Sequence, residues 1–255
     1  MCGIIGFTGR KPAKDILIDG LERLEYRGYD SAGIALLNDD DTLTIRKKAG
    51  RVSELRELCK DGDYSSTCGI GHTRWATHGG VTDANAHPHR CGNVALIHNG
   101  IIENYSDIIR EYGLADKLVS ETDSEVVAAL LDTLYDGDPI AAIRKAVKII
   151  AGSFALCIMF ADRPGIIYAV RNVSPMVAAH SEEGSIIASD LTAIISFSKD
   201  YFVVPEYHIL TMTQEGIRVE DLKGNEVKPQ MLEITWDITA AQKGGFPHFM
   251  LKEIY

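Results

Sequence analysis

The sequence predicts two antiparallel β-sheets packed face to face, with helices on their outer surfaces. Two observations favour this architecture over a doubly wound parallel sheet: apolar strands follow one another in hairpins with short turns, and helical patterns occur in pairs. No repeat, low-complexity segment or proline-rich linker divides the 255 residues. A chain of this length buries roughly 70 to 75% of its unfolded surface, which is enough for one large core or two smaller ones.

The N-terminal half alternates between strand and helix signals. A proline at the start and a glycine at the end frame the first helical pattern, and an acidic turn joins two alternating segments into a hairpin. A loop rich in His, Gly and Asn joins the last two strands of this half, and such loops carry function more often than packing. The predicted elements are a strand at 2–9, a helix from Pro12 to Arg27, a hairpin at 32–48, a helix at 51–62 and strands within 68–80 and 93–104.

The C-terminal half begins with two helices and continues with strands. Thr122 and Glu125 have the spacing of a capping box, and Asp138 with Pro139 predicts the start of a second helix that runs to about Ile150. Short turns then separate apolar runs at the spacing of antiparallel meanders. The predicted strands are 153–161, 165–172, 176–181 and 185–189, followed by a hairpin within 201–222.

Composition excludes several classes of partner. The chain has 26 Lys and Arg against 36 Asp and Glu, a net charge of −10, so neither a nucleic acid duplex nor an anionic membrane is expected as the main partner. The longest run without charged residues, 149–161, is too short to span a membrane. The N-terminus lacks the charge order of a secretory signal, and the five cysteines contain no CxxC pair, so we expect a cytoplasmic protein with reduced thiols.

Cys2 is the first candidate for chemistry. A small second residue normally permits removal of the initiator methionine, which would leave a cysteine that carries the free chain amine. An α-amino group has a pKa of about 7.7 to 8.0 and can take the proton of a thiol near neutral pH, without a distant histidine. The alternative is that Cys2 is a small buried apolar residue at the start of a strand.

The loop between 72 and 98 contains five of the eight histidines. His87, His89 and Cys91 alternate as metal ligands can, but Pro88 between them argues against a strand, so we expect no metal. A second interpretation is a site for a small zwitterion, with Arg74 as partner of a carboxylate and with Thr77 and His78 as further donors. The third is that Arg74 pairs with a surface acid and the histidines are polar loop residues.

Three further positions have two interpretations each. Asn99 and Gly100 form either a type I′ turn or a pair of donors for an oxyanion. Asp123 either complements the dipole of the helix that it begins or binds an ammonium group. Arg27, near the end of the first helix, is a cation without an assigned role.

Six motifs in order identify a resemblance. MCGIIGF, LEYRGYDSAG, GHTRWATHG, NAHPH, HNGIIEN and SETDSE together resemble the glutaminase domain of the glutamine fructose-6-phosphate amidotransferase family. These enzymes are class II glutamine amidotransferases within the N-terminal nucleophile hydrolases. The resemblance implies an α+β fold, a four-layer αββα sandwich of two antiparallel sheets, and it covers the whole chain.

The resemblance also implies roles for the candidate residues. Cys2 would attack the side-chain amide of L-glutamine, with its own amine as base and then as acid, and no cofactor is needed. Asn99 and the Gly100 N–H would form the oxyanion hole. The remaining roles are binding of the glutamine head group by Arg74 and Asp123, further glutamine contacts by Thr77 and His78, and support of the site by Arg27, Trp75 and His87.

The resemblance implies a larger enzyme as well. Residues 2–240 would form the glutaminase domain, and 241–255 would begin a linker to a sugar isomerase half that is absent here. The full-length enzyme, with a homodimer as one expected assembly, would use the ammonia to make glucosamine 6-phosphate from fructose 6-phosphate. The alternatives are a glutaminase half that feeds another acceptor and, if Met1 is retained, an inactive glutamine-binding module.

Overall fold

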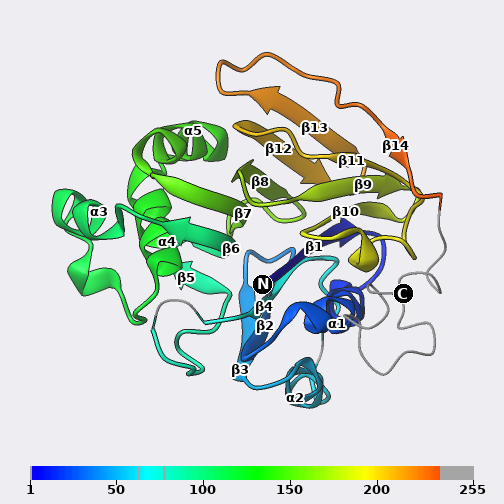
Figure 1. Ribbon diagram of the computed structural model, residues 1–255, viewed down its shortest axis with the longest axis horizontal. Helices are drawn as coiled ribbons and strands as arrows, with labels where there is room; N and C mark the ends of the chain where they lie inside the picture. Colours follow the sequence, from blue (N-terminus) through cyan, green and yellow to red (C-terminus); the bar gives the residue numbers. More distant parts are fainter. Residues whose placement is uncertain (1, 63, 77–78, 236–255) are drawn as a thin grey trace, which may run out of the picture.

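A computed structural model describes residues 2–62, 64–76 and 79–235, and it contains two antiparallel sheets that pack on each other (Figure 1). Within these residues the larger sheet has, in spatial order, β14 (Leu232–Glu233), β11 (Asp200–Val203), β9 (Val177–Ser181), β10 (Gly184–Ala188), β1 (Gly3–Gly9), β4 (Cys68–Arg74), β2 (Ser31–Leu37) and β3 (Leu43–Ala49). The smaller sheet has β13 (Gly216–Asp221), β12 (His208–Thr213), β8 (Ile167–Asn172), β7 (Gly152–Phe160), β6 (Val94–Ile102) and β5 (His89–Cys91).

Helices cover the outer face of each sheet. α1 (Ala13–Leu24) and α2 (Val52–Leu58) lie on the larger sheet, while α3 (Tyr105–Tyr112), α4 (Asp123–Leu134) and α5 (Pro139–Ile149) lie beside the smaller one (Figure 1). Short 3₁₀ turns occur at Glu25–Arg27, Ala115–Lys117 and Leu191–Ala193. The predicted four-layer αββα sandwich is therefore confirmed.

Three apolar cores fill the spaces between the four layers. Leu17 and Phe7 belong to the core between α1 and the larger sheet, Leu96 and Val127 belong to the core between the smaller sheet and α4, and Ile4 belongs to the core between the sheets. Burying each such side chain stabilises the fold by roughly 1.5 to 3 kcal/mol. The middle core is where the two sheets place side chains from distant parts of the sequence together.

The alternation of side chains along strands decides which residues reach that middle layer. In β4, Cys68 and Ile70 lie in the core between the sheets, so His72 and Arg74 share their face. In β6, Ala95 and Ile97 lie in the same core, and alternation places Asn99 with them. Polar residues of β4 and β6 therefore meet at one end of the layer between the sheets.

The C-terminal strands differ from one continuous meander. β7 pairs with β8 and β9 pairs with β10, as the short turns predict, but β8 and β9 belong to different sheets. The chain crosses between the sheets after Asn172. The predicted hairpin within 201–222 is formed by β12 and β13, while β11 joins the larger sheet.

The two helices after residue 120 begin as their sequences predict. The Thr122 hydroxyl accepts a hydrogen bond from the Glu125 N–H (3.2 Å), and the Asp138 carboxylate accepts one from the Ala141 N–H (3.0 Å). Such caps stabilise a helix by about 1 kcal/mol each. No helix within the described ranges has the length and apolar character needed to cross a membrane. The predicted linker at 241–255 lies outside the described residues and stays a prediction.

Candidate active site

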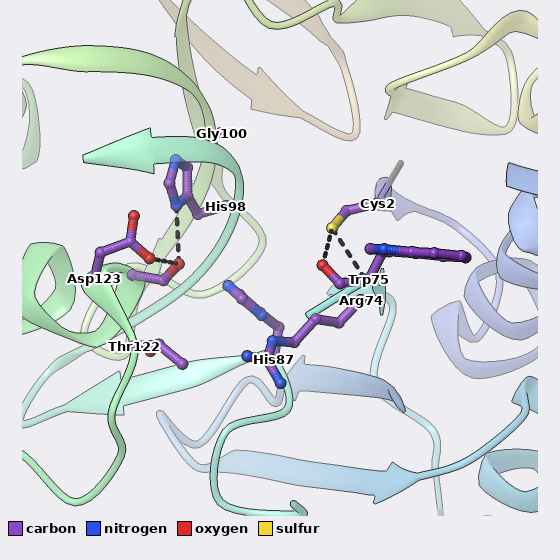
Figure 2. Close-up of a pocket in the computed structure, with 9 residues that line it drawn as sticks. Cys2, Arg74, Trp75, His87, His98, Gly100, Thr122 and Asp123 are labelled. Atoms are coloured by element: carbon purple, nitrogen blue, oxygen red, sulfur yellow. Dashed lines mark hydrogen bonds between the residues drawn. The ribbon is translucent and has the colours of Figure 1, made fainter. Parts of the chain in front are cut away.

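Cys2 lies directly before β1 and is held by the backbone of Trp75 (Figure 2). The Trp75 N–H donates to Cys2 Sγ at 3.2 Å, and the thiol donates to the Trp75 carbonyl at 3.6 Å. Burial raises the pKa of the Cys2 thiol, and the Trp75 N–H opposes that shift because it stabilises the thiolate. The thiol is therefore protonated near neutral pH and needs a base before it can act as a nucleophile.

The pairing of β1 with β4 brings these two segments together. Gly3 lies opposite Thr73, so both strands end at the same edge of the sheet. Asp30 fixes the chain that follows β4, because its N–H donates to the Arg74 carbonyl (2.8 Å) and its carboxylate accepts from the Ala76 N–H. The backbone around Trp75 is thus fastened before it meets the thiol.

Gly28 explains why the Trp75 ring can lie where it does. Its φ is +114°, and a Cβ at this position would lie 2.0 Å from Cε3 of Trp75. Any side chain would displace the indole. Glycine at position 28 is therefore a packing requirement for the tryptophan beside the thiol.

A small cleft opens beside the thiol. Figure 2 shows Cys2 and Trp75 on one side of this cleft and Asp123 on the other, with the Arg74 side chain between them. The residues that line the cleft come from the N-terminus, β4, the following loop, β6 and the start of α4. They are Cys2, Arg74, Trp75, His87, His98, Gly100, Thr122, Asp123 and Ser124.

Arg74 presents a buried guanidinium to the cleft. It is 4% exposed, and it donates to the carbonyls of Gly80 (3.1 Å) and Gly79 (3.4 Å). These bonds fix the side chain against the loop that follows β4. The interpretation of Arg74 as a partner of a surface acid does not fit this burial.

Asp123 places a buried carboxylate opposite Cys2. Its Oδ2 accepts from the Ile102 N–H (2.7 Å), and its Oδ1 accepts from the Ser124 hydroxyl (3.4 Å). Asp123 lies in the first turn of α4, where its charge complements the helix dipole, and its binding of an ammonium group stays a prediction. His98 Nδ1 lies 2.8 Å from the Ser124 hydroxyl, and burial lowers the pKa of His98 although the Asp123 charge opposes the shift.

Asn99 connects the smaller sheet to the nucleophile. Its Nδ2 donates to the Cys2 carbonyl at 3.1 Å, and its Oδ1 lies 2.9 Å from His72 Nε2. Asn99 and Gly100 both lie within β6, so the interpretation of this pair as a hairpin turn is wrong. Gly100 has a φ of +135°, and a Cβ there would lie 2.0 Å from the Ser153 carbonyl oxygen, so only glycine fits.

Three histidine rings pack together in the layer behind the cleft, His72 tilted over His87 and His89 edge-on to His87. The ring centroids of His72 and His87 are 4.1 Å apart, and those of His87 and His89 are 4.5 Å apart. Burial lowers the pKa of all three, so they are neutral near pH 7. Among the described residues, no group of three or more His, Cys, Asp or Glu side chains is arranged to hold a metal ion.

Arg27 lies outside the lining of the cleft. Its guanidinium donates to the Ser189 carbonyl at 3.3 Å and lies 3.6 Å from the Asp190 carboxylate. The Ser189 hydroxyl in turn accepts from the Ile4 N–H at 3.0 Å. Arg27 is thus connected to the strand that carries Cys2, through residues that are distant in sequence.

The structure adds residues that the sequence did not single out for the site. His98, Thr122 and Ser124 line the cleft, and His72 contacts Asn99. The helix start predicted at Thr122 is a signal that could have pointed to Thr122 and Ser124, whereas no pattern in the sequence singles out His98 or the contact of His72 with Asn99. Thr77 and His78 lie outside the described residues, so their predicted contacts stay predictions.

Sequence comparisons relate the chain to glutamine amidotransferases. A family model described as a glutamine amidotransferase domain matches residues 72–196. The whole chain is 44% identical to a glutamine–fructose-6-phosphate aminotransferase (isomerizing) of Thermus thermophilus and 42% identical to that of Clostridium tetani, and it spans 42% of the length of each.

Structural comparisons identify the same fold. Glutamine phosphoribosylpyrophosphate amidotransferase from B. subtilis superimposes with a TM-score of 0.74 at 24% identity, over 88% of this chain and 50% of that chain. A class-II glutamine aminotransferase domain protein from Silicibacter pomeroyi superimposes with a TM-score of 0.60 at 16% identity, over 87% of this chain and 99% of that chain. By its fold, its motifs and these matches, the chain belongs to the glutamine amidotransferase domain family.

Proposed function

We propose that this chain hydrolyses L-glutamine to glutamate and ammonia with Cys2 as the nucleophile. One observation carries the proposal: the half-buried thiol of Cys2 faces a cleft that also presents a buried cation, Arg74, and a buried anion, Asp123. The head group of an amino acid has one carboxylate and one ammonium group. A site with both partners favours such a substrate and disfavours amides that lack the head group, because an unpaired buried charge is costly.

The reaction follows from the groups around the thiol. Removal of Met1 frees the Cys2 amine, which takes the thiol proton as Sγ attacks the amide carbon of glutamine. Asn99 Nδ2 and the Gly100 N–H donate to the oxygen that becomes negatively charged. The amine then returns the proton to the departing nitrogen, and ammonia leaves. Water attacks the resulting thioester, glutamate is released and the thiol is restored.

The other predicted residues have supporting roles in this proposal. Thr77 and His78 make further contacts with glutamine, and His87 packs beneath the site. Trp75 is 54% exposed beside the thiol and covers the bound substrate, while Arg27 holds the end of the strand that carries Cys2.

We further propose that the ammonia serves glucosamine 6-phosphate synthesis from fructose 6-phosphate in a cytoplasmic, homodimeric full-length enzyme. Its support is the name of the relatives that are 42 to 45% identical over the whole chain. Residues 2–240 are the glutaminase domain in this proposal, and 241–255 lead to a sugar isomerase half. Because the relatives are more than twice as long, that half lies in the part that this chain does not match.

The proposal is tested by measuring intact mass and glutamate release on one sample. We expect a mass without Met1, release of glutamate from L-glutamine, and loss of turnover after one equivalent of a glutamine-like thiol alkylator. Glutaramate, which lacks the amino group, is the matched substrate control and should react far more slowly. A processed chain that leaves L-glutamine unchanged would contradict the proposal for this domain.

Asp123→Asn is expected to raise KM for L-glutamine roughly 10- to 100-fold, with a smaller change in kcat, because the charge pairs with the ammonium group in both the ground and transition states. The Asn side chain keeps an oxygen that accepts from the Ile102 N–H. The measurement is glutamate release over a range of glutamine concentrations. Asp107→Asn, on the exposed part of α3, is the matched control. An unchanged KM would remove Asp123 from the site.

A further inference from the structure

His72 is a buried residue of β4 that the proposed reaction does not use. It lies on the same face of β4 as Ile70 and Arg74, in the layer between the sheets. Its Nε2 is 3.0 Å from the carbonyl oxygen of His98 and 2.9 Å from Oδ1 of Asn99. The histidine of one sheet therefore contacts β6 of the other sheet, at the residue that hydrogen-bonds to the Cys2 carbonyl.

These two contacts determine the protonation of the ring. A backbone carbonyl oxygen can only accept a hydrogen bond, so Nε2 of His72 carries the proton and donates. His72 Nδ1 has no hydrogen-bond partner among the described residues, and a second buried N–H there would be left unpaired. The ring is thus the neutral tautomer with one N–H, at Nε2.

The tautomer in turn determines how the Asn99 amide is oriented. Because Nε2 of His72 is a donor, the amide atom that faces it must be the oxygen. The amide nitrogen then points the opposite way, toward Cys2, where it donates to the Cys2 carbonyl. A rotation of 180° about the amide would place an NH₂ group against the N–H of His72 and an oxygen against the carbonyl of Cys2, so both contacts would become repulsive.

The surroundings keep His72 in this state. Burial lowers the pKa of His72 to about 3, so the ring stays neutral across the physiological range. His87 stacks on the ring at 4.1 Å and restricts its rotation. Lys47 Nζ donates to the carbonyls of Ala84 (3.0 Å) and Ala86 (2.8 Å), which fastens the loop that carries His87.

We propose that His72 is a positioning residue that holds the Asn99 amide with its NH₂ group toward the oxyanion formed at Cys2. The proposal rests on the proposed glutaminase function. The negative charge on this oxygen develops only as Sγ attacks, so a misoriented Asn99 amide fails to stabilise the transition state. Binding of the glutamine head group to Arg74 and Asp123 is unaffected. His72 touches neither substrate nor nucleophile, and it acts through Asn99.

Two substitutions separate the donor from the shape of the side chain. In His72→Leu the donor is lost, and we expect kcat to fall roughly 10- to 100-fold while KM changes less than about 3-fold, since removal of a whole oxyanion donor costs about 10² to 10³ in kcat. In His72→Gln the side-chain nitrogen is the same number of bonds from the backbone as Nε2, so most of the loss should be recovered. Ile70→Ala, on the same strand and face, is the control for destabilisation alone.

A double-mutant cycle tests the route through Asn99. Asn99→Ala should lower kcat by about 10² to 10³, and adding His72→Leu to it should produce little further loss, because the group that His72 orients is already absent. Independent losses that multiply in the double variant would overturn the proposal. A rise in KM with unchanged kcat in His72→Leu would overturn it as well.

Nitrogen NMR of histidine-labelled protein gives a readout that needs no turnover. We expect the His72 signals of a neutral ring protonated at Nε2, without titration between pH 5 and 8, and loss of the through-hydrogen-bond contact in Asn99→Ala. A ring protonated at Nδ1 would disprove the inference even in an active enzyme. If the NMR signals show the expected tautomer but the protein does not hydrolyse glutamine, the orientation of Asn99 stands and the proposed glutaminase function is rejected.

Discussion

Cys2→Ala is expected to reduce glutamate release by about 10⁴-fold or more, because the reaction loses the atom that forms the covalent intermediate. Binding of L-glutamine should remain within a few-fold of the wild type, since Arg74 and Asp123 are unchanged and buried on the other sides of the cleft. The measurements are a coupled glutamate assay and calorimetric titration of the inactive variant with L-glutamine.

Cys91→Ala is the matched control for this experiment. Cys91 is a half-buried thiol that lies 3.9 Å from the Asp132 carboxylate and does not line the cleft. We expect it to retain full turnover and full sensitivity to one equivalent of a glutamine-like alkylator. Near-normal turnover of Cys2→Ala would refute the assignment of the nucleophile, and loss of binding together with turnover would mean that Cys2 has a structural role.

The layered architecture could be predicted because alternation and turn residues act locally. The segment around Ile4 and Phe7 reads as a strand buried on both faces, and the structure divides its side chains between two cores. The helix starts at Thr122 and Asp138 were equally local, since each cap is a bond within three residues. Such features depend only on residues that are close together in the sequence.

The errors concern information that a local pattern does not contain. Asn99-Gly100 is a strong hairpin signal, but here the positive φ of Gly100 occurs inside β6 because the neighbouring strand leaves no room for a Cβ. A short connection follows both β8 and β9, although only the one after β8, at Asn172, carries the chain to the other sheet. α3 escaped prediction because Ile108 is its one fully buried apolar residue.

The candidate site was predictable as a set of residues and less so as a set of contacts. Motif residues such as Arg74 and Asp123 do line one cleft. The partners that orient them come from across the fold: Arg27 meets Ser189, and His72 meets Asn99. These contacts depend on sheet packing and register, which fix side chains more than 25 residues apart, so composition and spacing could not identify them.

Acidification from pH 7.5 to 5.5 is expected to destabilise this domain by several kcal/mol. Burial lowers the pKa of His72, His87, His89 and His98, whereas histidine in an unfolded chain has a pKa of about 6.5. Below about pH 6.5 the unfolded chain therefore binds protons that the folded chain excludes. The free energy of unfolding falls as pH falls, by at most about 1.4 kcal/mol for each of these histidines between the two pH values.

Urea denaturation at pH 7.5, 6.5 and 5.5 measures this loss of stability. Most carboxylates stay ionised across that range, so the histidines dominate the change in the free energy of unfolding. His89→Gln tests the cause, because a glutamine nitrogen can still meet the Thr122 hydroxyl, which lies 3.0 Å from His89 Nε2, but cannot take up a proton. We expect this variant to lose less stability on acidification than the wild type. His180→Gln, at an exposed position on β9, should show the wild-type dependence. Equal stability of the wild type at pH 7.5 and 5.5 would mean that the buried histidines accept protons without unfolding. The neutral His72 ring that orients Asn99 would then be lost in mild acid.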